Sequence, residues 1–190
     1  MRALLIITLT CILPCQGFSQ KKHILEPAPV NFVINNAGLN VHGTIGGLEG
    51  SITIDDRSNA LSKIEGAIDP NTIKTGIELR DKHLKKADYF NVKEFPKISM
   101  ISTFIKSNGK NKYTGDFELI IKDIKKNISV PFTYSRIGDT YILKAEFSIN
   151  RLDFKLGEES IILSDNVKLK IDFRINEPQK IGSVDRTKFL

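Results

Sequence analysis

The chain has 190 residues, of which 41% are hydrophobic, and this length and composition fit one domain with a complete apolar core. Its formal net charge of +6 comes from lysines spread along the sequence. The two lysine clusters, Lys85-Lys86 and 122–126, lack the interleaved aromatic residues of a single-strand nucleic-acid binder, so we expect no nucleic-acid partner. A solvated surface is the simpler interpretation of this charge, and transient contact with an anionic membrane surface is the alternative.

The first residues of the chain are typical of a signal peptide. Arg2 precedes an almost wholly apolar run over residues 3–13. Gly17 and Ser19 then stand at the third-last and last positions before a cleavage site. The apolar run is too short to span a bilayer, so we predict a leader over residues 1–19 that is removed on export.

The mature chain is expected to begin at Gln20 and to form a single domain over 20–190, in the periplasm or secreted. A lipoprotein anchor on Cys15 is the competing interpretation, but Pro14 stands where such processing needs a small residue. Both cysteines, Cys11 and Cys15, lie in the leader. Disulfides and thiolate metal sites are therefore excluded from the mature protein, and we expect no bound metal.

Apolar side chains that alternate with polar ones predict that most of the mature chain forms β-strands. The clearest alternation runs over nine residues, 167–175. Repeated glycines between 38 and 50 predict sharp bends or bulges, and Pro131 predicts that its strand lies at an edge or carries a bulge. The tail from about residue 177 is expected to be loosely held. The eight expected strands include residues 32–34, 52–54, 64–68, 98–104, 113–121, 128–134, 141–149 and 167–175.

One long segment, Thr75–Pro96, interrupts the strands. Its apolar residues Ile77, Leu84, Ala87 and Phe90 follow one another at offsets of seven, three and three, which fits one face of a short helix. We predict a helical lid here.

These elements predict an all-β fold with an antiparallel sheet, closed into a barrel or packed as a sandwich. The long strands and the bend-making glycines favour the barrel. The predicted inner face is almost entirely apolar and includes Ile98, Met100, Ser102 and Phe104 of one strand. An eight-stranded barrel is either filled by side chains or holds one slender ligand, and the sequence leaves this choice open.

Several spaced motifs resemble the YceI family of polyisoprenoid-binding, lipocalin-like proteins. The lid carries Thr75-Gly76, Arg80-Asp81, His83-Leu84, Asp88-Tyr89-Phe90 and Phe95-Pro96 in the order and spacing of the family pattern, and two later stretches, from Phe117 to Pro131 and Asn150 to Phe154, match as well. The resemblance implies an extended eight-stranded antiparallel lipocalin-like barrel with a short helical lid insertion. It also implies an isoprenoid lipid as the ligand, such as a quinone or a prenyl phosphate, and no cofactor.

The candidate ligand-binding residues are the inward side chains of the strands and the polar and aromatic residues of the lid. Arg80 and His83 have donors for a phosphate or a quinone oxygen. The alternative, which we favour, is that Arg80 and Asp81 satisfy the lid backbone and each other while His83 packs. Arg151 and Asp153 are likewise expected to be structural. The expected ligand-binding set is Phe32, Ile34, Ile68, Arg80, His83, Leu84, Tyr89, Phe90, Met100, Phe104, Phe117, Leu119, Phe132, Phe147, Leu169 and Phe173.

Two other functions compete with an exported carrier or buffer of an isoprenoid. The first is a non-catalytic interaction module, whose filled barrel acts at the surface of a membrane or a redox partner. The second is a hydrolase, for which Asp81 with His83 is the only candidate dyad, and the usual serine-hydrolase and zinc-protease motifs are missing. We therefore predict that the protein is not an enzyme. The sequence leaves open whether the protein forms a homodimer.

Overall fold

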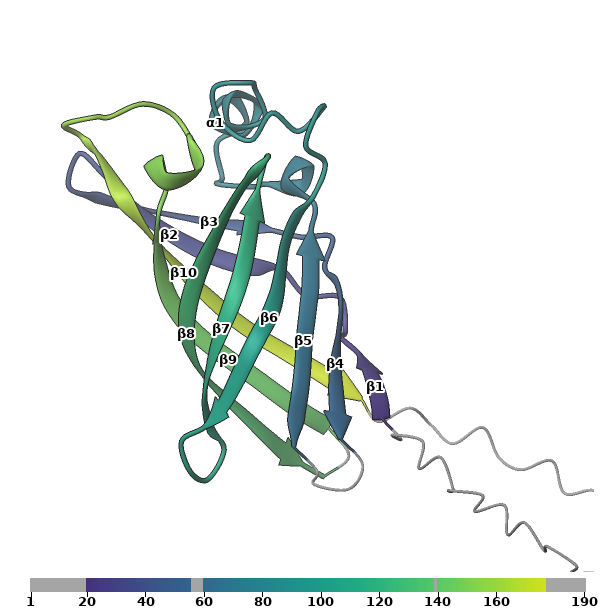
Figure 1. Cartoon of the computed structure of the whole chain (residues 1–190). Coiled ribbons are helices and arrows are strands. Elements are labelled where there is room, and N and C mark those ends of the chain that lie inside the picture. The colour runs from purple at the N-terminus through teal and green to yellow at the C-terminus, as the bar shows by residue number, and fades with distance from the viewer. Residues whose placement is uncertain (1–19, 56–59, 139, 177–190) are drawn as a thin grey trace, which may run out of the picture.

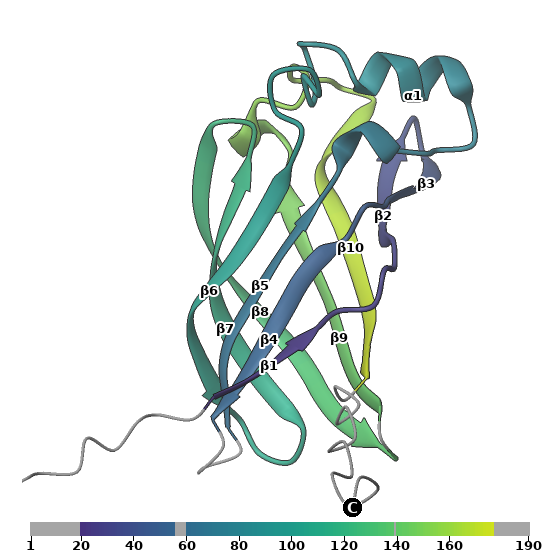
Figure 2. The ribbon, with the colours of Figure 1, turned by 90° about the vertical axis from the view of Figure 1, so that its right-hand side faces the viewer.

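The computed structural model describes residues 20–55, 60–138 and 140–176; the predicted leader and C-terminal tail lie outside this range. Its ten strands form one antiparallel sheet, which Figures 1 and 2 show strongly curled into a half-barrel, with the short helix at one end. The strands are β1 (Gln20–Ile24), β2 (Val30–Asn36), β3 (Leu39–Ile45), β4 (Glu49–Asp55), β5 (Leu61–Ile68), β6 (Ile98–Ser107), β7 (Lys112–Ile121), β8 (Ile124–Ile137), β9 (Thr140–Asn150) and β10 (Leu163–Asn176). Their order in the sheet is β1-β4-β5-β6-β7-β8-β9-β10-β2-β3.

The all-β antiparallel class is confirmed, but the expected number of eight strands is wrong. The two additional strands, β1 and β3, form the edges of the sheet. The glycines around β3 predicted only bends, and Gly38, with a φ of 82°, does form the turn between β2 and β3. Gly43, however, lies inside β3, where the ring of Phe32 on β2 covers it. A neighbouring aromatic ring thus fills the space that the missing side chain leaves.

The predicted helical lid is confirmed in a shorter form. Helix α1 covers Glu78–Leu84, and two short 3₁₀ turns lie at Pro70–Thr72 and Leu152–Phe154. Beyond Leu84 the chain continues in tight turns, in which Phe90 N–H donates to the Leu84 carbonyl at 3.1 Å, and Asn91 has a φ of 46°. Ala87 and Phe90 therefore follow the helix instead of extending its apolar face.

A bulge in β6 overturns the inward placement of Phe104. Ser102 pairs with Phe117 of β7, but Phe104 pairs with the next residue along, Asp116, so Thr103 is an extra residue in β6. One extra residue exchanges the two faces of a strand. Phe104 accordingly points outward and is 58% exposed, although the apolar alternation of the sequence continues through it.

Pro131 marks the point at which β8 loses one of its two neighbours. β8 pairs with β7 from Ile124 to Thr133, but it pairs with β9 only from Phe132 to Ile137. Pro131, which has no N–H to give to a ladder, is the first residue outside that second ladder. The expected edge position of Pro131 is therefore confirmed for the part of β8 from Ile124 to Pro131.

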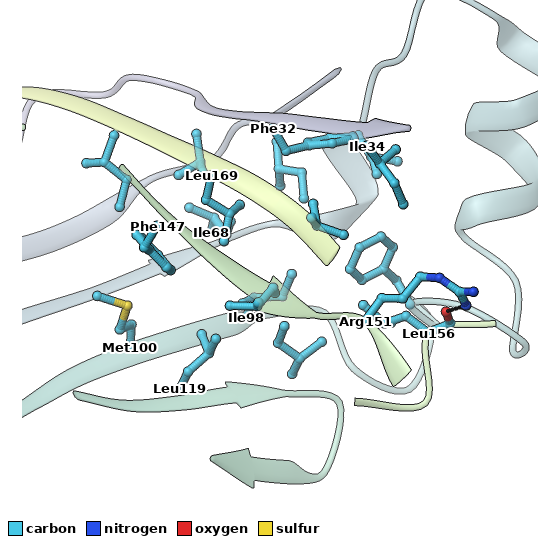
Figure 3. A pocket seen from close by; sticks show the side chains of 18 of the residues that line it. Phe32, Ile34, Ile68, Ile98, Met100, Leu119, Phe147, Arg151, Leu156 and Leu169 are labelled. Atoms are coloured by element: carbon cyan, nitrogen blue, oxygen red, sulfur yellow. Dashed lines mark hydrogen bonds between the residues drawn. The ribbon is translucent and has the colours of Figure 1, made fainter. Parts of the chain in front are cut away.

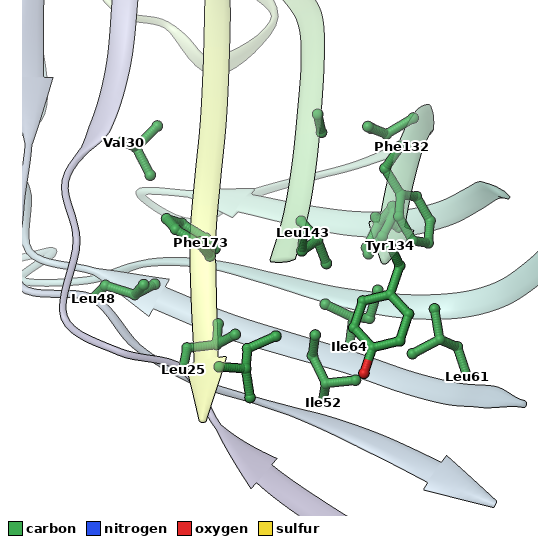
Figure 4. Packing of buried hydrophobic residues seen from close by; sticks show 14 of the residues in the cluster. Leu25, Val30, Leu48, Ile52, Leu61, Ile64, Phe132, Tyr134, Leu143 and Phe173 are labelled. Carbon is green, nitrogen blue, oxygen red and sulfur yellow. The ribbon is translucent and has the colours of Figure 1, made fainter. Parts of the chain in front are cut away.

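The end of the half-barrel away from α1 is packed with side chains (Figure 4). The rings of Tyr134 and Tyr141 stack at 5.4 Å between centroids, and those of Tyr113 and Phe132 at 5.3 Å. Ile52 and Ile175 are completely buried in the same cluster. This end is a solid core, and we call it the base.

Glu65 of β5 ties β1 and β4 to the middle of the sheet. Its carboxylate accepts hydrogen bonds from Lys22 of β1 at 2.9 Å and from the Ser51 hydroxyl of β4 at 2.9 Å, and it forms an ion pair with Lys63 at 2.6 Å. The contacts with Lys63, then Lys22 and Ser51, lower the pKa of Glu65 to about 2. The charged form of Glu65 is thus favoured by folding.

We expect Glu65→Gln to lower the thermal stability slightly at pH 7 and not at all at very low pH. A lowered pKa contributes stability above the unfolded value, and this contribution is lost as the pH falls through about 2. Because the ion pairs are largely solvated, the expected loss at pH 7 is at most about 1 kcal/mol, or about 3 °C in Tm. Thermal unfolding of both proteins between pH 7 and pH 2 measures this. A difference that grows toward low pH would contradict it.

Candidate functional site

An apolar cavity of about 590 Å³ opens between the packed base and the end that carries α1. Figure 3 shows aliphatic and aromatic side chains from β2, β5, β6, β7, β9 and β10 pointing into it, among them Phe32, Ile68 and Leu169. The structure therefore answers the question that the sequence left open: the base is filled and the upper half is hollow.

Fifteen of the sixteen predicted ligand-binding residues line this cavity, and Phe104 does not. Their ligand contacts stay a prediction. Arg80, His83, Leu84, Tyr89 and Phe90 lie on the lid. The remaining ten come from the sheet: Phe32, Ile34, Ile68, Met100, Phe117, Leu119, Phe132, Phe147, Leu169 and Phe173.

Several lining residues were not among the predicted ones. Ile98, Ile149 and Val167 belong to predicted strands and alternate inward, so the same pattern identifies them. Ile73 and Leu156 lie in connecting segments with no periodicity, and both are buried against the upper core. Only the folded chain brings these two residues to the cavity wall.

The mouth of the cavity is framed by the lid, by the end of the β2–β3 hairpin and by the segment from Glu158 to Leu163 (Figures 1 and 2). Thr75 is the centre of the lid network. The Arg80 guanidinium donates from Nε to Thr75 Oγ1 and from Nη2 to the Thr75 carbonyl, each at 2.7 Å. The Thr75 N–H and hydroxyl donate to Asp81 Oδ1 at 2.8 and 2.5 Å. The expected bonding of Arg80 and Asp81 to the lid backbone is confirmed by these contacts, and the two side chains are joined through Thr75.

The other side of the lid closes onto the 3₁₀ turn after β9. The ring of His83 packs edge-on against Tyr89, with centroids 5.0 Å apart. Tyr89 in turn lies over Gly157, whose N–H donates to the Asp88 carbonyl at 2.8 Å. A Cβ on Gly157 would lie 2.8 Å from the Tyr89 ring, and φ is +72° there, so glycine is required for this contact. His83 therefore packs, as expected.

Arg151 organises the segment that forms the third side of the mouth. Its buried guanidinium donates to the carbonyls of Leu156 at 3.0 Å, Glu158 at 2.7 Å and Ser164 at 3.1 Å, and to Asp165 Oδ1 at 2.9 Å. Figure 3 shows it beside Leu156, at one end of the apolar side chains. The predicted structural role of Arg151 is confirmed, and its donors are taken up by the protein itself.

Two further findings concern the described residues, 20–55, 60–138 and 140–176. No group of three or more histidine, cysteine, aspartate or glutamate side chains there could hold a metal ion. No helix there is long and apolar enough to cross a membrane. The candidate site is thus a largely apolar cavity, and at its mouth the side chains of Arg80 and Arg151 are bonded to neighbouring groups of the protein.

Comparison with known proteins identifies the family. The model of the YceI-like domain matches residues 26–175. The chain belongs to the YceI-like domain family. Protein YceI of Salmonella arizonae is 35% identical over 158 residues, which cover 77% of this chain and 80% of that protein. A UPF0312 protein of Enterobacter sp. (strain 638) is 36% identical over 96 residues, half of each chain.

Solved structures share the fold of this YceI-like domain. BcnA of Burkholderia cenocepacia superimposes with a TM-score of 0.71 and 23% identity, over 79% of this chain and 96% of that one. A polyisoprenoid binding domain from Saccharophagus degradans, implicated in plant cell wall breakdown, gives 0.65 and 13% identity, over 85% and 100%. At these identities the likeness shows the fold, and function has to be argued from the cavity.

Proposed function

We propose that this YceI-like domain binds an isoprenoid lipid, such as an isoprenoid quinone or a prenyl phosphate, and carries or buffers it outside the cytoplasm. The observation that supports this most directly is the cavity of about 590 Å³ with apolar walls. Its size lies within the range of small-molecule sites. The polyisoprenoid binding of the Saccharophagus degradans domain of the same fold supports the same ligand class.

An apolar chain suits this cavity better than a polar ligand. Burial of a methylene group contributes about 0.8 kcal/mol, so a long prenyl chain gains affinity without any directed polar contact. Between the mouth and the base, the walls are formed by side chains such as Ile98, Met100, Leu119 and Phe147. A polar group placed at that depth would lose its water without gaining a partner.

The head group of the ligand belongs at the mouth in this proposal. Arg80 and His83 both line the cavity there. Arg80 donates to Thr75 from Nε and Nη2, and its guanidinium carries five N–H donors in total, so donors remain for a quinone or phosphate oxygen. Export through the signal peptide predicted over residues 1–19 would place the carrier in the periplasm or outside the cell.

Neither competing function has comparable support. The hydrolase requires Asp81 to orient His83, but Asp81 is bonded to Thr75, and the His83 ring contacts Tyr89. The interaction module requires a filled barrel, whereas the upper half of this one is hollow. YceI-like domains are binding proteins, and the site agrees with a binding function.

The first experiment is native mass spectrometry of the mature protein, purified without detergent, followed by solvent extraction and identification of any released molecule. A bound mass that matches an isoprenoid quinone or a prenyl phosphate supports the proposal and names the ligand. A protein that stays free of ligand when both lipid classes are offered overturns it.

Gly66→Phe is expected to abolish isoprenoid binding while the protein stays folded. Gly66 of β5 lines the cavity, and a Cβ there would meet only Glu49 O at 3.7 Å and Leu48 Cδ1 at 3.8 Å, which are ordinary contact distances. A phenylalanine side chain therefore fits the backbone and occupies the space of the ligand. Binding is measured by quinone titration, and the fold by circular dichroism.

The matched control for this variant is Ser129→Phe, which adds the same ring on the exposed face of β8. It should bind the quinone like the wild type. Equal binding by Gly66→Phe and Ser129→Phe would show that the ligand does not use this cavity.

A further inference from the structure

Exposed apolar side chains surround the mouth of the cavity on all three sides. They are 53% to 105% exposed, although such residues are usually buried. Leu39 lies at the β2–β3 hairpin, Ile77 and Leu79 lie on the lid, and Ile161 and Ile162 lie on the segment after the second 3₁₀ turn. We call these five residues the mouth ring.

The three segments that carry the mouth ring lie next to the opening. Ala37 N–H donates to the Ile162 carbonyl at 2.7 Å, which joins the hairpin to the segment that carries Ile161. Arg80 and His83 of α1 line the opening beside Leu79. In Figure 1 the helix, the hairpin and this segment all lie at the same end of the sheet. The ring thus continues the apolar surface of the cavity to the outside.

From this continuity we propose that the mouth ring docks the protein on a lipid bilayer, with the opening against the membrane. The proposal rests on the proposed isoprenoid-binding function, because an isoprenoid resides in a bilayer and would enter the cavity there without crossing water. Five side chains on three separate projections leave the opening free between them. Side chains on separate projections can each insert into a fluid bilayer, whereas a rigid protein partner would need a complementary pocket for each of them.

The charges at this end identify the kind of membrane. The lid, Thr75–Pro96, has five lysines and arginines and four acidic residues, and the segment 151–165 has two basic and four acidic residues. The β7–β8 turn, residues 122–126, lies at the same end through contacts of Lys122 and Lys126 with this segment, and it has three basic residues and one acidic residue. The mouth end therefore carries ten basic and nine acidic residues, which is close to balance, although the whole chain carries a net charge of +6. Glu158 and Glu159 precede the ring residues Ile161 and Ile162, with Ser160 between them. Docking by the ring should accordingly depend on insertion of apolar side chains and not on anionic lipid.

The test is sedimentation of the mature protein with vesicles of phosphatidylcholine alone and of phosphatidylcholine mixed with phosphatidylglycerol. The ring variant is Leu79→Ser with Ile161→Ser. The control is Ile24→Ser with Ile137→Ser, two residues that are 64% and 66% exposed but lie away from the mouth. The ring variant should bind both vesicle types at least about tenfold more weakly than the wild type, and the control should bind normally.

Three results would overturn the docking proposal. The ring variant could bind like the wild type, or binding could require phosphatidylglycerol and disappear at high salt, which would indicate the basic surface instead. The ring variant could also convert a dimer to a monomer in analytical ultracentrifugation without any vesicle binding, in which case a second copy covers the ring.

Delivery of a quinone in ethanol separates this proposal from the proposed function. In that assay the ligand does not come from a bilayer, so the wild type and the ring variant should bind it equally. If neither binds it, the proposed function fails, while vesicle sedimentation of the free protein still decides the docking. If both bind it and only extraction of quinone from vesicles is slowed in the ring variant, both proposals hold.

Discussion

Replacement of Phe173 with aspartate is expected to unfold the protein. Phe173 of β10 is buried opposite Leu143 of β9, at the boundary between the cavity and the packed base (Figure 4). Loss of a buried phenylalanine ring costs about 3–5 kcal/mol, and an unpaired carboxylate among apolar side chains costs several kcal/mol more. Together these losses approach the whole stability of a typical domain, about 5–15 kcal/mol. Far-ultraviolet circular dichroism and urea unfolding measure the effect.

The control for this variant lies three residues earlier on the same strand. Lys170 points outward, is 63% exposed and pairs with Glu146 at 3.3 Å. Lys170→Glu removes that surface pair, which contributes at most about 1 kcal/mol. The variant should remain folded and bind ligand. A folded, ligand-binding Phe173→Asp protein would show that the inner face of β10 has been assigned wrongly.

Arg151→Met is expected to lower the free energy of unfolding by about 3–5 kcal/mol and to release the segment from Leu156 to Leu163 first. The substitution keeps the length of the aliphatic stem but leaves the carbonyls of Leu156, Glu158 and Ser164 without their donor. Removal of one partner from a buried charged network costs about this much. Urea unfolding gives the total, and amide hydrogen exchange shows which residues lose protection.

Arg174→Met provides the matched control, because Arg174 is an exposed arginine on β10. Its effect should stay within about 0.5 kcal/mol. Because Arg151 shapes one side of the mouth, its variant should also bind quinone more weakly, and Arg174→Met should not. Uniform loss of protection over the whole sheet in Arg151→Met would contradict a local role.

The alternation of apolar and polar residues was sufficient to predict the class of the fold and eight of its strands. It failed at β3, because Gly43 has no side chain to alternate, and the ring that covers it comes from Phe32, eleven residues earlier. It failed again at Phe104, which shares its two-residue spacing with Ile98 and Met100, because the bulge at Thr103 exchanges the faces of β6. Both failures have the same cause: pairing with a neighbouring strand decides which way a residue points.

The sequence predicted most of the residues that line the cavity, but it did not predict that the cavity exists. Inward alternation and the lid motif identified fifteen residues that line the cavity. Periodicity does not report the space left between opposite walls, so a filled and a hollow barrel have the same pattern. Ile73 and Leu156 were missed because their burial results from where the connecting segments lie in the folded chain. Arg151 was predicted to be structural, but the carbonyl groups that it binds could not be predicted, because the folded segment around it brings them together.

The missing ladder above Pro131 has a mechanical consequence. Between Ile124–Pro131 of β8 and Phe147–Asn150 of β9 the wall lacks the paired backbone hydrogen bonds that join these strands farther down. Side chains such as Ile128 and Phe147 pack against the upper core instead. Spreading these two strands here breaks no ladder hydrogen bond, so this stretch of the wall resists spreading less than the paired strands beside it. For the proposed ligand, we expect side-chain packing between these two stretches to limit the width of the molecule that the cavity accepts.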